Sequence, residues 1–440
     1  MNLSFAKALD RAVGGALCGL LRTSDRLVAW VRPDPAPIGR VRHLLVVKLW
    51  GLGNWALLRP LVRDLRDRWP GARLSIVTLQ ANAPLVADLA DETLLVRPQG
   101  ILRTALDLGA AVRRLRRDPP EMSVDFEQFS TVGVLLARAS GIPQRLGFRS
   151  GAHARDGLLT VRVPFRTDAH ASRSFRDLAE AAGVAAGPYV AGGLAPSPAG
   201  IAEAEAFLAG DAASGPSDPQ APLVLLHPGS GDNFPGRRWS EAGFSAVGRQ
   251  AIERHGARVV VTGGAGEAAL ASRVAVGAGA AARSAAGLLS VEGLVGLLAR
   301  ATVLVSNDTG PVHLASALGV PVLALFGPNT PVLYGPLSGG SRAFYRALPC
   351  SPCLTTESYR SSACRIHTCM ASLSTGEVVA ALDALLGARS SPVSARSSGG
   401  KAPATLGPSA SPSGRPSEAR ERVRSQGAEG PRPAPPEVRP

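Results

Sequence analysis

The sequence predicts an α/β protein built from two doubly wound domains, and two observations lead to this prediction. A buried strand, a glycine turn and an amphipathic helix follow one another near the amino-terminal end, and the same pattern recurs in the second half. In both halves the helix ends in a similar turn, Pro70-Gly-Ala-Arg73 and His255-Gly-Ala-Arg258, that leads straight into a β-branched strand. Repeated βαβ units of this kind are typical of Rossmann-like domains with parallel sheets.

The first domain is predicted to span residues 41–190. Its first strand is expected from His43 to Leu49, followed by the glycine turn Trp50-Gly-Leu-Gly-Asn54 and an amphipathic helix. The next strand is expected over residues 73–79. Further along, the acidic stretch Val124-Asp-Phe-Glu-Gln-Phe129 follows another predicted strand, so its carboxylates are placed at a strand end.

The second domain is predicted to span residues 222–387. Strands are expected over residues 223–226, 258–262, 302–306 and 321–326, with helices over 240–255 and 311–318. The stretch 191–221 is rich in Pro, Gly, Ala and Ser and is predicted to be the linker between the domains. The segment 388–440 has almost no large apolar residue and is predicted to be a disordered tail.

Residues 1–40 are predicted to form a basic amphipathic helix, over residues 3–31, and a proline-rich linker. Two interpretations of this helix stay open: docking on an anionic inner membrane leaflet, or packing on the first domain. No run of about 20 apolar residues is free of charge, so no ordinary membrane span is predicted. We therefore expect a cytoplasmic protein, with peripheral contact to the inner membrane as an open alternative.

The 440 residues carry a formal net charge of +14, nearly all of it arginine. A basic balance suits nucleic acids, anionic membranes or phosphorylated substrates. Aromatic residues make up only 5% of the chain, which leaves few platforms for stacking bases. Nucleic-acid binding is therefore the least favoured of the three.

The segment from Val305 to Gly319 reads as a strand end, a polar turn and a helix start. Asp308 or Thr309 is expected to cap this helix, and Gly310 permits close approach of a ligand to the backbone. A helix start with small residues and free amides is a pre-formed anion site. The alternative is a capped helix without a ligand, with His313 as a buried structural residue.

Two other loops favour the ligand. His227-Pro-Gly-Ser-Gly231 follows a predicted strand and precedes two arginines, Arg237 and Arg238, suited to phosphate oxygens. Thr262-Gly-Gly-Ala-Gly-Glu267 follows another, and its glutamate is suited to ribose hydroxyls. All three loops fall at carboxyl ends of strands in one domain, where open parallel sheets bind ligands. Together they predict a nucleotide diphosphate site.

These motifs resemble glycosyltransferase family 9, the family of the ADP-heptose:lipopolysaccharide heptosyltransferases, over residues 41–386. The strongest part is Ser306-Asn-Asp-Thr-Gly-Pro-Val-His313 with Leu325-Phe-Gly-Pro328 after it. The resemblance implies a GT-B fold with two Rossmann-like domains facing a cleft. It also implies inverting sugar transfer without a metal or cofactor, from a nucleotide-sugar donor on the second domain to a glycolipid acceptor on the first.

The resemblance also assigns donor-binding residues in the second domain. It implies that Thr309 and Gly310 hold the donor diphosphate, that Asp308 lies beside the sugar and that His313 braces the loop. Arg237 stands where the family commonly has a phosphate-binding lysine, and an arginine preserves the positive charge. Glu267 is expected at the adenosine ribose.

The acceptor side departs from the family pattern. Family members often have an aspartate general base after the glycine turn, but here Gly53 is followed by Asn54, whose amide cannot take a proton. Asp125 and Glu127 are the candidate replacements, with Glu127 preferred and a structural role as its alternative. Lys48 is expected either to steer an anionic acceptor in the cleft or to face solvent.

Four cysteines are clustered near the carboxyl end of the second domain, with His367 among them. Their spacing admits a structural zinc site, although the second pair is wider than the usual ribbon spacing, so reduced packing thiols are preferred. The four are Cys350, Cys353, Cys364 and Cys369.

The sequence thus predicts an enzyme that transfers a sugar, a heptose from ADP-heptose being preferred, onto a lipopolysaccharide-core or related glycolipid hydroxyl. Two alternatives stay open. One keeps the fold and uses another nucleotide-sugar for a different surface glycan. The other, suggested by Asn54, is a nucleotide-sugar binding protein without transfer activity.

Overall fold

The computed structural model describes residues 39–390, apart from 129, 150–153, 186, 188, 190–192, 211–220, 232–234, 356–361 and 363. It also describes Gly14, Gly15, Cys18, Gly19 and Leu21. Most of the predicted amino-terminal helix and nearly all of the predicted tail lie outside these residues. Within the described part of the chain no helix is long and apolar enough to cross a membrane.

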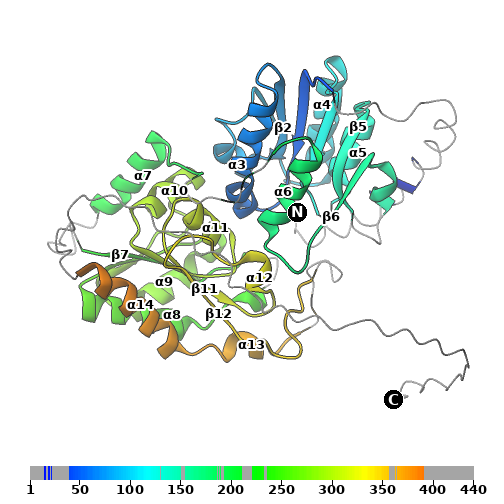
Figure 1. The fold of residues 1–440 in the computed structure, drawn as a ribbon. Coiled ribbons are helices and arrows are strands. Elements are labelled where there is room, and N and C mark those ends of the chain that lie inside the picture. Colours follow the sequence, from blue (N-terminus) through cyan, green and yellow to red (C-terminus); the bar gives the residue numbers. More distant parts are fainter. Residues whose placement is uncertain are drawn as a thin grey trace, which may run out of the picture. The chain divides into compact units, whose positions relative to one another are not determined.

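The first domain is a six-stranded parallel sheet in the order β3-β2-β1-β4-β5-β6, with helices packed on it (Figure 1). Its strands are β1 His43–Val47, β2 Arg73–Leu79, β3 Glu92–Val96, β4 Met122–Asp125, β5 Gln144–Arg149 and β6 Val161–Pro164. Its helices are α3 Leu52–Arg68, α4 Ile101–Arg117, α5 Val132–Ala139 and α6 Ala171–Ala181, with the short 3₁₀ turns η2 Gln80–Leu85 and η3 Ala154–Leu158.

The second domain repeats this plan, with the order β12-β11-β10-β7-β8-β9 and all neighbours parallel. Its strands are β7 Leu223–His227, β8 Arg258–Val261, β9 Ala282–Ser284, β10 Val303–Asn307, β11 Val322–Phe326 and β12 Arg342–Tyr345. Its helices are α7 Pro198–Ala209, α8 Glu241–His255, α9 Ala268–Ala278, α10 Val291–Arg300, α11 Gly310–Ala317, α12 Pro331–Tyr334, α13 Thr368–Ala371 and α14 Thr375–Ser390, with the 3₁₀ turns η5 Pro235–Arg237 and η6 Ala265–Glu267.

Both sheets therefore have the strand order of a doubly wound fold, which confirms the predicted fold class. In each sheet the first strand of the domain lies in the middle, and the chain leaves it once to either side. The switch points fall between β1 and β4 and between β7 and β10. Loops diverge at such points, so the carboxyl ends of these four strands are where a ligand site is expected.

The turn after β1 shows why its glycines are needed. Gly51, which precedes α3, has a φ of 94°, a conformation that side chains disfavour. The helix that follows buries Trp55, Leu58 and Val62 against the sheet at 0% exposure. The turn is thus fixed between a fully buried strand and a tightly packed helix.

Part of the predicted linker 191–221 is helical. Ser197 caps α7 by accepting a hydrogen bond from the amide of Gly200, and proline occupies the first turn. The helix packs on α10 of the second domain, as Figure 1 shows. The small residues that suggested a linker instead allow two helices to approach closely.

At the other end of the chain, Cys18 is buried at 0% exposure in a cluster with Val134, Leu158 and Leu159. This part of the predicted amino-terminal helix thus packs on α5 and the adjoining turn η3. The contact fits the domain-packing interpretation of the helix. Apart from Cys18, Gly14, Gly15, Gly19 and Leu21, residues 3–31 lie outside the described residues. At the carboxyl end, α14 continues to Ser390, past the predicted boundary at 387.

We expect Gly296→Ala to destabilise the protein, because a Cβ there would lie 2.1 Å from the carbonyl oxygen of Gly200 on α7. Overpacking of this kind typically costs about 1–3 kcal/mol. The matched control is Gly109→Ala in α4, where the nearest atom to the new Cβ is 3.5 Å away, and a gain of up to about 1 kcal/mol is expected. Urea unfolding measures both, and equal effects would contradict this packing.

Candidate active site

In the second domain the loops after β7 and β10 are joined across the switch point by Asn307, the last residue of β10. Its Nδ2 donates to the carbonyl oxygen of Pro228 at 2.8 Å, and its Oδ1 accepts from the amide of Trp239 at 3.0 Å. Asn307 is fully buried, so both ends of its amide are satisfied by the backbone. The His-Pro-Gly turn and the Arg-Arg-Trp segment are therefore held against β10.

Glu267 joins the loop after β8 to the same turn. Its Oε1 accepts from the amides of Ser230 and Gly231, both at 2.9 Å, and its Oε2 accepts from the amide of Gly264 at 3.1 Å. Burial alone would raise the pKa of Glu267, but the amides of Gly231 and Gly264 outweigh it and lower the pKa. Gly229 is required here, because a Cβ would lie 2.2 Å from Glu267 Oε1.

Arg237 spans the loops after β7 and β10. Its Nη2 donates to the carbonyl oxygen of Ser230 at 2.9 Å and its Nη1 to that of Asp308 at 3.0 Å. Its Nε is buried and has no hydrogen-bond partner among the described residues. A guanidinium fixed at one end with a donor in reserve is well placed to bind an anion at this point.

The start of α11 differs from the prediction in one respect, because neither predicted residue caps it. Thr309 occupies the cap position without a side-chain cap bond, and its Oγ1 donates to the carbonyl oxygen of Asn307 at 3.1 Å. The Asp308 carboxylate accepts from Asn329 Nδ2 at 2.9 Å. Because these side chains turn away from the helix, the amides at the start of α11 keep the anion-binding capacity predicted for them.

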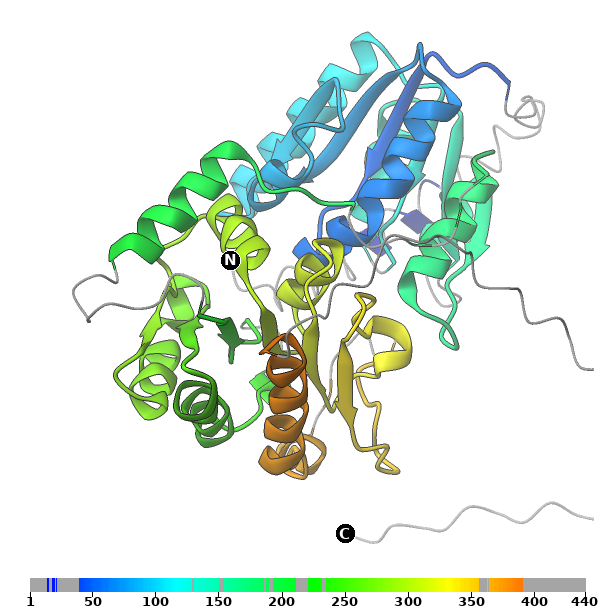
Figure 2. The ribbon, with the colours of Figure 1, turned by 60° about the vertical axis from the view of Figure 1, so that its left-hand side comes forward.

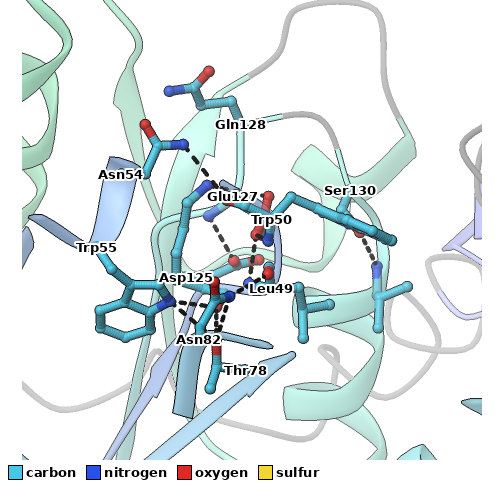
Figure 3. Close-up of polar contacts among 12 residues, drawn as sticks. Leu49, Trp50, Asn54, Trp55, Thr78, Asn82, Asp125, Glu127, Gln128 and Ser130 are labelled. Atoms are coloured by element: carbon cyan, nitrogen blue, oxygen red, sulfur yellow. Dashed lines mark hydrogen bonds and ion pairs between the residues drawn. The ribbon is translucent and has the colours of Figure 1, made fainter. Parts of the chain in front are cut away.

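In the first domain the carboxylate of Glu127, which follows β4, holds the turn after β1 (Figure 3). Its Oε1 accepts from the amides of Leu49 and Trp50 at 2.6 and 2.8 Å, and its Oε2 lies 3.3 Å from Lys48 Nζ. Glu127 is 3% exposed and Lys48 2%. The alternative prediction, that Lys48 faces solvent, is therefore wrong, because its ammonium forms a buried ion pair with Glu127.

Asp125, at the end of β4, is enclosed behind Glu127. Its Oδ1 accepts from the amide of Glu127 at 2.9 Å and its Oδ2 from Arg155 Nη2 at 3.0 Å. Burial raises the pKa of Asp125 to about 6, against the opposing charge of Arg155. Gly133 gives the carboxylate room, because a Cβ there would lie 2.5 Å from Oδ2. Of the two acidic candidates, only Glu127 touches the glycine turn.

Asn54 lies in the first turn of α3, with its Nδ2 3.5 Å from the carbonyl oxygen of Trp50. It is half-buried, whereas Gly53 beside it is buried against the second domain. A Cβ on Gly53 would lie 2.7 Å from His313 Cδ2 and 2.9 Å from Gly310 Cα. Thus α3 and α11 meet at a pair of glycines, and Figures 1 and 2 show α11 against the beginning of α3.

Further contacts join the two domains around His313. Its ring centroid is 6.3 Å from that of His170 and 6.1 Å from that of Tyr334. The Tyr334 hydroxyl donates to Gln128 Oε1 at 3.3 Å, and His170 Nε2 lies 3.1 Å from the carbonyl oxygen of Gly335. Burial lowers the pKa of His170 to about 4, so this imidazole is neutral near pH 7 and donates from Nε2.

Sequence reasoning brought together the three loops of the second domain but missed His170, Gln128, Asn329 and Tyr334. None of them belongs to a recognisable motif, and no local pattern shows that a tyrosine in α12 reaches a glutamine after β4. Only the packing of one domain on the other makes them neighbours. A signal was present for Gln128, which directly follows the candidate Glu127, and for Asn329, which directly follows the Leu325-Phe-Gly-Pro328 motif.

The cysteine cluster is not arranged as a metal centre in the part of the chain that the structure describes, where no group of three or more His, Cys, Asp or Glu side chains is placed to hold a metal ion. Cys350 and Cys364 are exposed and Cys369 is buried. Burial raises the pKa of the Cys369 thiol, and the three neighbouring cysteines add to this. Zinc binding stays a hypothesis from the sequence.

Two doubly wound domains, each with its strand-end loops gathered at a switch point, form a fold of the GT-B type. The sequence profile of glycosyltransferase family 9 (heptosyltransferase) matches residues 115–363. The chain belongs to this family and is a glycosyltransferase.

Individual relatives agree with the family. Lipopolysaccharide heptosyltransferase 1 of Pseudomonas aeruginosa is 38% identical over 141 residues, which cover 31% of this chain and 38% of that protein. Lipopolysaccharide heptosyltransferase 2 of Salmonella typhimurium is 27% identical over 311 residues, 68% of this chain and 86% of that protein. The structure of E. coli ADP-heptose LPS heptosyltransferase II is similar in fold, with a TM-score of 0.61 and 21% identity over 79% of this chain and 99% of that chain.

We expect Glu127→Gln to destabilise the protein strongly, because it leaves the Lys48 ammonium buried without its counter-ion. Breaking one partner of a buried pair typically costs about 3–5 kcal/mol, whereas removing both is often tolerated. The double variant Lys48→Met with Glu127→Gln is therefore expected to recover much of the loss. Denaturant unfolding completes the cycle, with the exposed pair Arg273 and Glu241 as control. Additive losses would contradict the pairing.

We expect Asp125 to make stability fall as pH rises through its folded-state pKa. Its pKa is raised from 3.8 to about 6, so the folded protein binds the proton more tightly than the unfolded chain between these values. The stabilisation is present below about pH 4 and is lost by pH 6 to 7. Asp125→Asn lacks this titration, so the free energy of unfolding of the parent minus that of the variant should be higher at pH 4.5 than at pH 7.5.

Unfolding curves at both pH values measure this difference, and Asp168→Asn, at an exposed position, serves as control. A parent-minus-variant difference that is higher at pH 7.5 than at pH 4.5 would show that ion pairing with Arg155 outweighs burial at Asp125.

Proposed function

We propose that this glycosyltransferase transfers a heptose from ADP-heptose to a hydroxyl group of a lipopolysaccharide core or a related glycolipid. The observation that carries the proposal is the convergence of three strand-end loops on the start of α11, spanned by Arg237. The relatives add the chemistry, since two are lipopolysaccharide heptosyltransferases and the similar structure is an ADP-heptose LPS heptosyltransferase.

On the donor side, the diphosphate is proposed to lie at the start of α11. The amides that follow Thr309 and the helix dipole attract its charge, and Arg237 completes the site with its Nε donor. These groups also stabilise the leaving diphosphate as the sugar is transferred. Asp308 is proposed beside the sugar, and His313 positions this loop against Gly53. The proposal needs no metal ion.

Glu267 is proposed to contact the ribose and also to hold the loop after β7. Three backbone amides already occupy its carboxylate, which has about four lone-pair sites. A ribose hydroxyl can therefore take at most the remaining position. The main effect of Glu267 is to fix the turn at Ser230 on which Arg237 rests.

On the acceptor side we propose Glu127 as the group that takes the proton from the attacking hydroxyl. Asn54 cannot take this proton, because its side chain is an amide, and Asp125 is enclosed behind Glu127. Glu127 uses three lone-pair sites on Leu49, Trp50 and Lys48, which leaves one on Oε2. If Glu127 takes the proton, the Lys48→Met, Glu127→Gln double variant regains stability without regaining turnover. If the double variant regains both, Glu127 only braces the turn.

We expect Arg237→Ala to weaken ADP binding about 10- to 100-fold, the loss typical of a hydrogen bond to a charged group. Isothermal titration with ADP measures it, and Arg273→Ala, an exposed arginine of the same domain, is the control. Unchanged affinity in Arg237→Ala would contradict the diphosphate site. Absence of ADP binding by the parent protein, together with binding of another nucleotide-sugar, would replace the donor and keep the fold.

A further inference from the structure

Asn329 lies in the connection between β11 and α12 and is one of the most enclosed polar residues near the proposed donor site. Its side chain is 4% exposed, and its Nδ2 donates to Asp308 Oδ2 at 2.9 Å. Asp308 belongs to the turn before α11, at the carboxyl end of β10. Asn329 therefore borders the loop that is proposed to hold the diphosphate and the sugar.

The contact with Asp308 determines which way the Asn329 amide points. An ionised carboxylate only accepts hydrogen bonds, so the NH₂ group must face Asp308. The carbonyl oxygen Oδ1 then necessarily points away from Asp308. This oxygen is buried and has no hydrogen-bond partner among the described residues.

A buried acceptor without a partner is uncommon and unfavourable, since the great majority of buried polar atoms are paired. An apolar residue at this position would avoid the free-energy cost of the unpaired oxygen. Asn329 instead has its Nδ2 bonded to Asp308 and its Oδ1 unpaired among the described residues. Near Asp308, the ligand group rich in hydroxyls is the sugar of the nucleotide-sugar.

We propose that Asn329 is a specificity-determining residue whose Oδ1 accepts a hydrogen bond from one hydroxyl of the transferred sugar, while its Nδ2 holds Asp308 in place. This inference rests on the proposed nucleotide-sugar function. It separates recognition of the sugar from recognition of the nucleotide, because Arg237 and the amides of α11 contact only phosphate in that proposal. Among the described residues, Asn329 forms no hydrogen bond with Arg237 or with the amides of α11.

The test compares ADP with ADP-heptose on the full chain by isothermal titration. Asn329→Leu nearly preserves size and removes both Oδ1 and Nδ2, so ADP-heptose affinity is expected to fall at least about tenfold, the loss typical of one hydrogen bond, with ADP affinity changed less than about twofold. Thr330→Ala is the control, because Thr330 caps α12 by accepting from the amide of Val332. It should affect both ligands alike.

A second measurement uses ADP-heptose analogues that each lack one hydroxyl. The parent is expected to lose about tenfold in affinity for one of them, and Asn329→Leu should not distinguish that analogue from ADP-heptose. If Asn329→Leu fails to fold, Asn329→Ser replaces it in the same comparison.

Three results would overturn the inference: equal weakening of ADP and ADP-heptose, which makes Asn329 only a support for Asp308; unchanged binding of both; or no analogue whose loss depends on Asn329. Failure of the parent to bind ADP would instead refute the proposed function, so the two failures are distinct.

Discussion

The site depends on one constraint that acts in the same way in both domains. A side chain at or just after the end of the domain's fourth strand must hold the loop that follows its first strand. The connections that leave the two strands of a switch point diverge to opposite sides of the sheet, so these loops have no strand ladder to hold them. In the first domain Glu127 follows β4 and binds the amides after β1. In the second, Asn307 ends β10 and binds the loop after β7. Each tie is buried, and each fixes the backbone from which further residues extend.

The two ties differ in charge, and this difference has chemical consequences. Asn307 is neutral and needs no counter-ion, and Arg237 pairs with Asp308 at the longer distance of 3.9 Å. Glu127 is compensated by Lys48, and Asp125 behind it by Arg155. The first domain thus pairs its buried cations closely with its own carboxylates, at 3.3 and 3.0 Å, whereas the Arg237–Asp308 pair of the second domain is longer and leaves the Nε donor of Arg237 unused. This asymmetry fits a diphosphate on the second domain and a hydroxyl acceptor on the first.

The domains meet where side chains are smallest. At Gly53 and Gly310 a Cβ on either residue would crowd the other helix. The starts of two helices thus come together, and each carries partial positive charge. An anion near this meeting point relieves the repulsion between them. Around it, Tyr334 with Gln128 and His170 with Gly335 link the domains through polar contacts, so the position of the α11 loop depends on the packing of both domains.

The sequence by itself determined the two doubly wound domains, the approximate bounds of six strands and the three loops of the second domain, because periodicity, glycine turns and helix starts are local signals. It also placed Glu127 and Asp125 at the end of a strand. Tertiary structure decided what these carboxylates contact, since burial and counter-ions such as Lys48 come from distant segments. It made residues 198–209 a helix rather than linker, because the contact that stabilises them lies on α10. It alone revealed Asn329, whose free oxygen follows from a contact with a residue 21 positions away.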